Sequence, residues 1–299
     1  MQSHLNADYK RVNQGTLFVV ATPIGNLDDL SPRARQVLSD ADLIAAEDTR
    51  HTGRLLSHFG IKSRQIALHD HNEETALAGI IADLEDGKSV ALVSDAGTPL
   101  ISDPGFRLLR AAHDAGIRVS PIPGPSAVVA ALSVCGLPVD EFCFTGFLPG
   151  KKAARQKKLQ ALAGESRTMI FYESVHRIVE TTEDLNDVFG DERQVFIGRE
   201  LTKLHEQCVR TDLRSAAAML ADGRIPVRGE FVLVVAGCAT LAGPLVEIST
   251  EHLLRMLTEA LPGKQAVAIA ASLSGQSKND LYRQMLALTA DKNTVDRND

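Results

Sequence analysis

Several residue types are scarce in this chain, and each shortage argues against a class of protein. The sequence has no Trp and only three Tyr among its 299 residues, so it does not suggest a broad aromatic surface for stacking bases. It contains no uninterrupted apolar run of roughly 18 residues, the minimum for a membrane-spanning helix. We therefore expect no membrane partner. Residues 1–14 lack the apolar core of a signal peptide, and we expect them to form a flexible extension.

The four cysteines lie far apart in the sequence, at Cys135, Cys143, Cys208 and Cys238. Without a close pair, they indicate neither a Cys-based metal site nor a disulfide framework, and no two histidines have i, i+4 spacing. Scattered thiols are typical of a reducing compartment, so we expect a cytoplasmic protein without a metal. The sequence also lacks a G-x-x-x-x-G-K-[ST] motif, which argues against a nucleotide-dependent kinase or ATPase.

Positive charge is not in excess, because 32 Lys and Arg stand against 38 Asp and Glu, for a net charge of −6. A nucleic-acid partner would therefore need a local basic patch. The most basic run is residues 151–158, KKAARQKK, which carries five cations and no acid. Such a run is ordinarily a solvated helix face, and this one is also the first candidate for a phosphate contact.

Short apolar runs alternate with helical patterns from residue 15 onward. This alternation predicts a parallel α/β sheet with helices on both faces over residues 15–137. Leu137-Pro138 marks a boundary, and residues 138–240 are predicted to form a second α/β domain with a more mixed sheet. The strands of the first domain are predicted at residues 17–21, 43–46, 65–68, 90–93 and 119–122.

The end of the chain has a different pattern. Gly243-Pro244 marks a linker, and residues 244–290 carry three helical patterns, at about 249–260, 264–274 and 277–288. A tight turn at Gly275 followed by Ser277 as a helix cap matches a helix-turn-helix. A small helical cap that packs on the body or on a second subunit explains the same pattern equally well.

The stretch from Ser94 to Gly105 is the most informative motif. It follows the buried run Val90–Val93 and repeats Ser-Asp-x-Gly eight residues apart. Ligands bind beyond the carboxyl ends of parallel strands, and glycine lets the backbone approach a ligand closely. We therefore predict a ligand loop at residues 95–99. We interpret Asp103-Pro104 as the N-cap and first position of the following helix.

Polar side chains collect where the predicted strands of the first domain end. Because parallel strands share one carboxyl edge, we expect these side chains to gather in one crevice, although polar residues are common in any loop. They are Asp28, Glu47, Asp48, Arg50, His51, His69, Asp70, His71, Asp95, Asp103 and Ser126.

These phrases, in this order, resemble the tetrapyrrole methylase superfamily of S-adenosylmethionine-dependent enzymes, and within it the branch that methylates small-subunit ribosomal RNA. The resemblance spans about residues 15–237, and the tail also looks like that branch. The phrases that carry it are residues 21–27 (ATPIGNL), 46–50 (AEDTR), 68–73 (LHDHNE), 94–105, 123–127 (PGPSA), 171–174 (FYES), 199–203 (RELTK) and 229–230 (GE).

The resemblance implies two α/β domains of the tetrapyrrole-methylase type, with S-adenosylmethionine in the cleft between them, plus the small helical tail. It also implies a homodimer and methyl transfer to the 2′-hydroxyl of a cytidine ribose in 16S rRNA of the small ribosomal subunit. The cofactor would lie against Pro23, Ile24, Asp95, Ala96, Gly97, Leu100, Ile101, Ser126, Ala127 and, from the second domain, Tyr172 and the segment before Phe231.

Methyl transfer to a ribose hydroxyl requires alignment of the reacting atoms and removal of a proton. Candidate groups come from the strand ends: Glu47, Asp48, Arg50, His51, Asp70, His71, Glu173, Arg199, Glu200 and Lys203. We predict that Glu47, Asp48 and Arg50 face Arg199, Glu200 and Lys203 across the cleft. Arg50 and Arg199 suit phosphate binding through their forked donors. The alternative for Arg199-Glu200 is a structural role, in an ion pair that ties the domains together.

Two other functions fit the same residues less well. The first is a methylase of the same fold that acts on a tetrapyrrole or a protein side chain, because fold does not fix the substrate. The basic run and the tail favour RNA over that acceptor. The second is a non-catalytic RNA-binding assembly factor, against which the intact loops at residues 95–97 and 123–126 argue.

Overall fold

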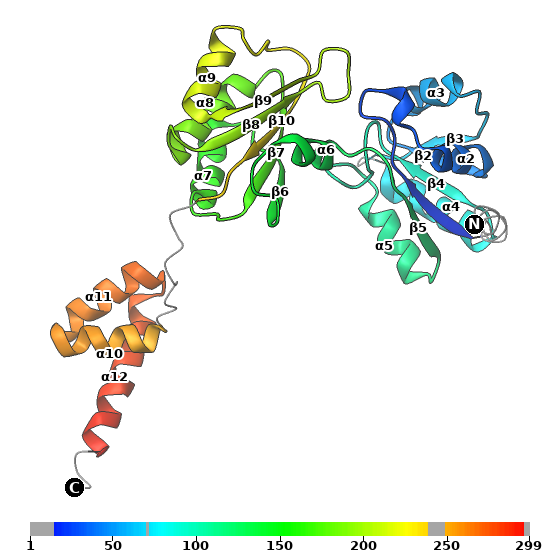
Figure 1. The fold of residues 1–299 in the computed structure, drawn as a ribbon. Helices are drawn as coiled ribbons and strands as arrows, with labels where there is room; N and C mark the ends of the chain where they lie inside the picture. The colour runs from blue at the N-terminus through cyan, green and yellow to red at the C-terminus, as the bar shows by residue number, and fades with distance from the viewer. Residues whose placement is uncertain (1–14, 70–71, 239–248, 296–299) are drawn as a thin grey trace, which may run out of the picture. The chain divides into compact units, whose positions relative to one another are not determined.

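The computed structural model describes residues 15–69, 72–238 and 249–295. It divides the chain into two compact units, residues 1–239 and 240–299 (Figure 1). The predicted extension at residues 1–14, the linker at Gly243-Pro244, and Asp70 and His71 lie outside the described residues.

The first half of the larger unit is a parallel sheet with the strand order β3-β2-β4-β1-β5. Because successive side chains of a strand point to opposite faces, β4 buries Val90 and Leu92 against α4 and α5. It buries Ala91 and Val93 against α2 and α3. The expected parallel sheet with helices on both faces is confirmed. Its elements are β1 (Thr16–Val20), η1 (Leu27–Asp29), α2 (Pro32–Asp40), β2 (Leu43–Ala46), α3 (Thr49–His58), β3 (Gln65–Ala67), α4 (Glu73–Glu85), β4 (Val90–Val93), α5 (Phe106–Asp114) and β5 (Arg118–Ile122).

Helix α5 begins two residues later than the sequence suggested. We expected Asp103 to cap it, but the helix starts at Phe106, with Gly105 at the N-cap position. The backbone N–H of Leu108 instead donates to the buried carboxylate of Glu73, at 3.1 Å. Because Glu73 supplies the acceptor that a capping side chain would provide, Asp103 is free to point elsewhere.

The second half of the larger unit contains the expected mixed sheet, and its strand order is β6-β7-β10-β8-β9. Strands β6 and β7 are parallel, and the other pairs are antiparallel. The elements are α6 (Ala127–Val134), which precedes the sheet, β6 (Phe142–Phe147), α7 (Lys152–Leu162), β7 (Thr168–Ser174), α8 (Ile178–Phe189), β8 (Gln194–Arg199), β9 (Gln207–Asp212), α9 (Leu213–Ala221) and β10 (Glu230–Val235).

The two faces of the second sheet are covered differently. Helices α7, α8 and α9 bury one face around Phe171, Ile197 and Leu233 (Figure 1). On the other face, Phe196 and Val232 pack against α6. The first half contributes Ile24 to this second cluster, so the uncovered part of the face lies next to the first half.

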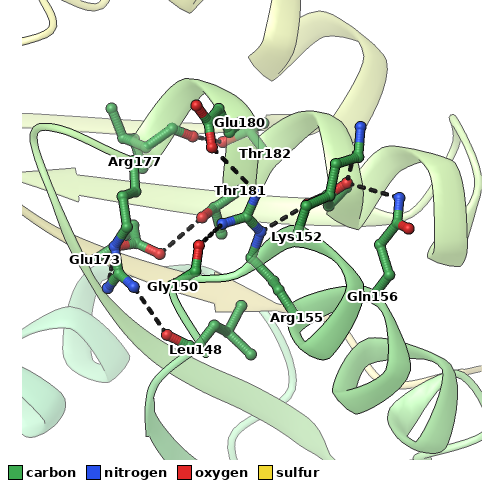
Figure 2. Close-up of polar contacts among 12 residues, drawn as sticks. Leu148, Gly150, Lys152, Arg155, Gln156, Glu173, Arg177, Glu180, Thr181 and Thr182 are labelled. Atoms are coloured by element: carbon green, nitrogen blue, oxygen red, sulfur yellow. Dashed lines mark hydrogen bonds and ion pairs between the residues drawn. The ribbon is translucent and has the colours of Figure 1, made fainter.

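The basic run differs from the expected solvated face at one position. Its four lysines are exposed, but the Arg155 side chain is completely buried. Its Nε donates to the buried Asp184 carboxylate at 2.6 Å, and Glu180 and the Gly150 carbonyl accept from its other nitrogens (Figure 2). Arg155 is therefore part of the packing between α7 and α8, and it is not available to bind phosphate.

Over residues 249–295, which the structure describes, the smaller unit contains three helices, α10 (Thr250–Ala260), α11 (Gly263–Ser274) and α12 (Lys278–Val295). They pack around Leu254, Val267, Ala270, Leu281 and Met285. Helix α11 ends at Gly275, which has a left-handed backbone with φ +70°, and the Ser277 hydroxyl accepts the Asp280 N–H at 3.2 Å. The three predicted helices and the turn between the last two are confirmed.

The buried ion pair between Arg155 and Asp184 predicts a large loss of stability when Asp184 is removed. Asp184→Ala leaves the Arg155 guanidinium buried without its main partner, so we expect a loss of about 3–5 kcal/mol in the free energy of unfolding. As a control, Asp114→Ala removes a solvent-exposed pair with Arg110 and is expected to cost less than about 1 kcal/mol. Urea denaturation of both variants measures the difference. Equal losses would contradict the structural role of Asp184.

Candidate functional site

Loops from three strands of the first sheet interlock at its carboxyl edge. Thr22, after β1, exchanges two backbone hydrogen bonds with Gly97, after β4, at 2.9 and 3.0 Å. Glu47, after β2, accepts the Asp95 N–H at 3.2 Å, and Asp95 accepts the Asp48 N–H at 3.1 Å. The predicted gathering of strand-end residues therefore occurs at this edge.

The turn at Gly97 requires glycine for its backbone conformation. Its φ is +86°, which side chains rarely adopt, and an added Cβ would lie 3.3 Å from the Ile24 side chain. The Thr98 hydroxyl donates to the Pro125 carbonyl at 3.1 Å, so the segment before α6 is tied to the same loop. The loop is held by these bonds before any ligand binds.

This loop and the open face of the second sheet line a pocket of about 260 Å³, here called pocket A. The lining of pocket A is mostly apolar, with a few carboxyl and hydroxyl groups. From the first half and α6 it comprises Ile24, Ala96, Gly97, Thr98, Ile101, Asp103, Ser126 and Ala127. From the second sheet it comprises Phe147, Tyr172, Glu173, Ser174, Gly198, Leu201, Glu230, Phe231 and Val232.

Most of the residues predicted to contact a cofactor line pocket A. They are Ile24, Ala96, Gly97, Ile101, Ser126, Ala127 and Tyr172. Pro23 and Asp95 line an adjoining pocket instead. Leu100 lines neither of these two pockets; its backbone has φ +76°, and its side chain packs close to Gly105.

Asp103 lines pocket A, as expected of the strand-end side chains, but the sequence also suggested that it caps α5, and it was not among the predicted cofactor residues. Burial, together with the nearby Glu47 and Asp95 carboxylates, raises the pKa of Asp103 to about 6, although a hydrogen bond from Ser94 acts in the opposite direction. Burial and the Asp103 charge also raise the pKa of Tyr172 to about 12. The signal available in the sequence was the second Ser-Asp-x-Gly phrase.

Aromatic rings and two arginines shape the wall of pocket A that the second sheet provides. The Tyr172 ring packs edge-to-face against Phe144 and Phe147, with centroids 4.9 and 5.7 Å apart. Arg177 donates to the Leu148 carbonyl at 3.0 Å, and Arg155 donates to that of Gly150 at 3.3 Å (Figure 2). The chain that follows Phe147 is therefore fixed at two points.

Glu173, which the sequence suggested as a candidate proton acceptor, has a structural role instead. Its carboxylate is buried, pairs with Arg177 at 2.8 Å, and accepts the Thr181 hydroxyl at 2.7 Å (Figure 2). It also accepts the backbone N–H of Ser174 at 2.7 Å. With both oxygens engaged, Glu173 holds the pocket wall.

A second pocket of about 410 Å³, here called pocket B, adjoins pocket A and shares Ile24, Ala96 and Glu230 with it. Its lining is more polar at one side, where α3 and the β8–β9 turn contribute. The other residues that line pocket B are Thr22, Pro23, Gly25, Leu27, His51, Arg54, Leu55, His58, Asp95 and Lys203.

The predicted group Glu47, Asp48 and Arg50 lies behind pocket B and does not line it. Glu47 and Asp48 bond to Asp95 as described above, and Asp48 also caps α3 by accepting the Arg50 N–H at 2.8 Å. Hydrogen bonds from Arg50 hold the pKa of Asp48 well below its usual range. The Arg50 side chain is 86% exposed and pairs with Asp48.

Of the predicted group Arg199, Glu200 and Lys203, only Lys203 lines pocket B, and the other two make contacts within the fold. Arg199 is buried, and its guanidinium donates to the carbonyls of Arg228 and His205, at 2.7 and 3.0 Å. Glu200 pairs with Lys203 at 2.8 Å, and both residues belong to the second half of the unit. Arg199 is also not presented to a phosphate, because these two donors are used within the fold.

Lys203 is the member of that group that reaches pocket B. It lies directly on the first half of the unit, where a Cβ at Gly25 would be 2.3 Å from the lysine Cγ. Its ammonium pairs with Glu200 at 2.8 Å and with Glu230 at 2.9 Å. Burial alone would lower the pKa of Lys203, but the two carboxylates raise it overall, so Lys203 is charged at neutral pH.

Two further observations limit what the site can hold. Among the described residues, no group of three or more His, Cys, Asp or Glu side chains is arranged to bind a metal ion. None of the helices in the described ranges is long and apolar enough to cross a membrane.

Comparison with known proteins identifies the family. Residues 16–217 match the Tetrapyrrole (Corrin/Porphyrin) Methylases, and residues 246–289 match the RsmI C-terminal HTH domain. The chain belongs to the tetrapyrrole methylase family. The second match covers the helical tail and agrees with the helix-turn-helix interpretation of its sequence.

Relatives with the name ribosomal RNA small subunit methyltransferase I align over almost the whole chain. The protein of Escherichia coli O157:H7 is 48% identical over 96% of this chain and 99% of its own length. That of Pseudomonas aeruginosa is 51% identical over 92% and 98%. That of Synechocystis sp. is 46% identical over 93% and 99%.

Solved structures share the fold at low sequence identity. The uroporphyrin-III-C-methyltransferase of Thermus thermophilus is 21% identical, with a TM-score of 0.53 over 75% of this chain and 94% of its own. A cobalt precorrin-4 methyltransferase is 16% identical, with a TM-score of 0.55 over 74% and 95%. At these identities the likeness establishes the fold only.

The raised pKa of Asp103 predicts a pH-dependent stability difference. The ordinary Asp value is 3.8, so between pH 4 and 6 the unfolded chain releases this proton before the folded protein does. Wild-type stability therefore falls as the pH rises through this range, and the loss persists above it. Asp103→Asn cannot ionise and escapes the loss. We expect it to gain about 1–2 kcal/mol relative to wild type between pH 4 and 7.5, after allowance for partial exposure.

Urea denaturation of wild type and Asp103→Asn at several pH values measures this difference. The comparison cancels the contributions of other titrating groups, which both proteins share. A stability difference that stays constant from pH 4 to 7.5 would contradict the raised pKa.

Proposed function

We propose that this chain uses S-adenosylmethionine to methylate the 2′-hydroxyl of a cytidine ribose in 16S rRNA of the small ribosomal subunit. The observation that carries the proposal is the near full-length likeness to proteins named ribosomal RNA small subunit methyltransferase I, at 46–51% identity. The likeness includes the helical tail as well as the two α/β halves. A methylase that acts on a tetrapyrrole lacks this support, because those relatives share the fold alone.

The chemistry of pocket A fits the cofactor. S-adenosylmethionine supplies an electrophilic methyl group on a cationic sulfur and also carries an ammonium, a carboxylate and an adenosine. Apolar walls from Ile24, Leu201 and Val232 suit the flat adenine. The Asp103 carboxylate suits a cationic group. The left-handed turn at Gly97 lets the backbone approach the ligand without an intervening side chain.

The residues of pocket B suit the acceptor. Pocket B joins pocket A at Ala96 and Glu230, so an acceptor oxygen there lies next to the cofactor site. Alignment of nucleophile and methyl group is the main requirement for this reaction. The interlocked loops at Thr22, Gly97 and Asp95 supply a rigid wall for that alignment.

We assign Glu230 as the base that accepts the proton of the ribose hydroxyl. Its side chain is 79% exposed and lines both pockets, whereas the Asp95 carboxylate is engaged with the Asp48 N–H. Lys203, charged and 2.9 Å from Glu230, stabilises negative charge on the acceptor oxygen. In this proposal Glu47, Asp48, Arg199 and Glu200 position these groups, and Arg50 remains at the surface as a phosphate ligand.

A homodimer and a cytoplasmic location stay predictions from the sequence. The family resemblance supports the first, and the four scattered free cysteines support the second.

Gly97→Ala tests the cofactor site. The new side chain at φ +86° strains the loop and points toward Ile24, so we expect at least a tenfold loss of S-adenosylmethionine affinity by calorimetric titration. Gly116→Ala is the matched control, because Gly116 has φ +69° with nothing within 4 Å of an added Cβ. Both variants should lose similar stability. Unchanged affinity in Gly97→Ala would remove Gly97 from the cofactor site.

Glu230→Gln tests the proton acceptor. The substitution keeps the shape and the backbone bonds of β10, so we expect cofactor affinity to change little. We expect kcat for methyl transfer to fall by about 10²–10⁴-fold. Steady-state kinetics with saturating subunits measures it. A kcat within twofold of wild type would exclude Glu230 as the base.

The function itself is tested by incubating the protein with methyl-labelled S-adenosylmethionine and small ribosomal subunits from cells that lack its gene. Label in a 16S rRNA cytidine, resistant to alkaline cleavage at its 3′ side, is the expected result. Cofactor binding without labelled rRNA would redirect the search to another acceptor. Absence of cofactor binding by folded protein would overturn the methyltransferase assignment.

A further inference from the structure

Helix α3 presents to pocket B a face of one arginine and two histidines that the reaction itself does not use. The helix sequence, TRHTGRLLSH, contains no acidic residue. Its apolar side packs Leu55 and Leu56 into the core of the first half. His51, Arg54 and His58 follow at i, i+3 and i+7, so they share one exposed face, at whose buried edge Leu55 also lines pocket B.

This face borders the acceptor side of the site. His51, Arg54 and His58 all line pocket B, together with Lys203 from the second sheet. His58 and Lys203 also line a third, more open pocket of about 580 Å³, which continues past Asn26 and Leu204. The pockets that share these residues therefore form a continuous depression from the cofactor site along α3.

Arg54 differs from the other cations at the site in having no partner. Lys203 pairs with Glu200 and Glu230, Arg50 pairs with Asp48, and Arg199 donates to two carbonyls. Among the residues that the structure describes, the Arg54 side chain makes no hydrogen bond or ion pair, and Arg54 is exposed. An unpaired guanidinium beside an acceptor pocket is placed to bind an anion, and its forked donors match a phosphate.

We propose that the face formed by His51, Arg54 and His58 binds a phosphate of the RNA strand next to the methylated ribose, with Arg54 as the main ligand. This inference rests on the proposed function, because RNA is the acceptor that carries a phosphate on each side of the target ribose. The contact positions the strand without reading its sequence. It also compensates for the overall negative charge of the chain at the one place where the RNA must approach closely.

The test compares Arg54→Gln with Arg110→Gln. Arg110 is an exposed arginine on α5 whose side chain is 74% exposed and which lines none of the three pockets. Both substitutions remove one positive charge from a helix surface, so their effect on net charge is identical. Circular dichroism and thermal unfolding should show that both variants fold like wild type.

For Arg54→Gln we expect the KM for unmethylated small subunits to rise about tenfold, with kcat and S-adenosylmethionine affinity unchanged. The dependence of log(kcat/KM) on log[salt] should become shallower by about 0.7–0.9, which corresponds to one lost phosphate contact. Arg54→Lys keeps the charge and should recover most of the salt dependence. Arg110→Gln should match wild type in each measurement.

Two outcomes would overturn the inference, and they are distinguishable. If wild type methylates the subunits and Arg54→Gln behaves like Arg110→Gln, the phosphate contact is wrong and the proposed function stands. If wild type binds the cofactor but does not methylate rRNA, the proposed function fails and the phosphate contact fails with it.

Discussion

The paired backbone bonds between Thr22 and Gly97 are the contact on which the site depends. They join the loops after β1 and β4, which are neighbouring strands at the centre of the first sheet. The bonds form only because Gly97 adopts a left-handed backbone. That turn places Ala96 and Gly97 in the wall of pocket A and Asp95 beside pocket B. One loop therefore contributes to both pockets. Because the loop is rigid, it would hold a cofactor in pocket A at a fixed distance from an acceptor in pocket B.

The second sheet contributes by leaving part of one face uncovered. Helices α7, α8 and α9 fill one face, whereas the other is covered by α6 and by residues from the first half. An apolar sheet surface that is not covered by a helix must be covered by something else or bind a ligand. Here Val232 and Tyr172 continue the buried cluster directly into pocket A. The pairs Arg155–Asp184 and Arg177–Glu173 strengthen the opposite side, so the wall has firm support.

The helices and strands could be predicted from the periodic pattern of the sequence. The long-range hydrogen bonds and ion pairs of the charged residues could not. The parallel sheet, the mixed sheet and the three tail helices follow from apolar runs and caps that each act locally. Asp103 and Arg155 were misinterpreted because their roles depend on distant partners. Glu73 supplies the acceptor at the start of α5 from 35 residues away, and Asp184 buries Arg155 from 29 residues away. Arg199 was placed in the right region, but its bonds to two carbonyls could not be read from its neighbours.

The distribution of charge around the site follows the chemistry of the two reactants. The Asp103 carboxylate lies in pocket A, where a cationic cofactor would bind, and Glu230 lies at the junction with pocket B, where the acceptor proton would be removed. Cations lie farther along, on α3 and at Lys203, where a polyanionic acceptor would approach. A uniform charge of either sign would attract one reactant and repel the other. Because the chain is acidic overall, a local cationic face gives the acceptor a defined route, and it places the strand before the two reacting atoms meet.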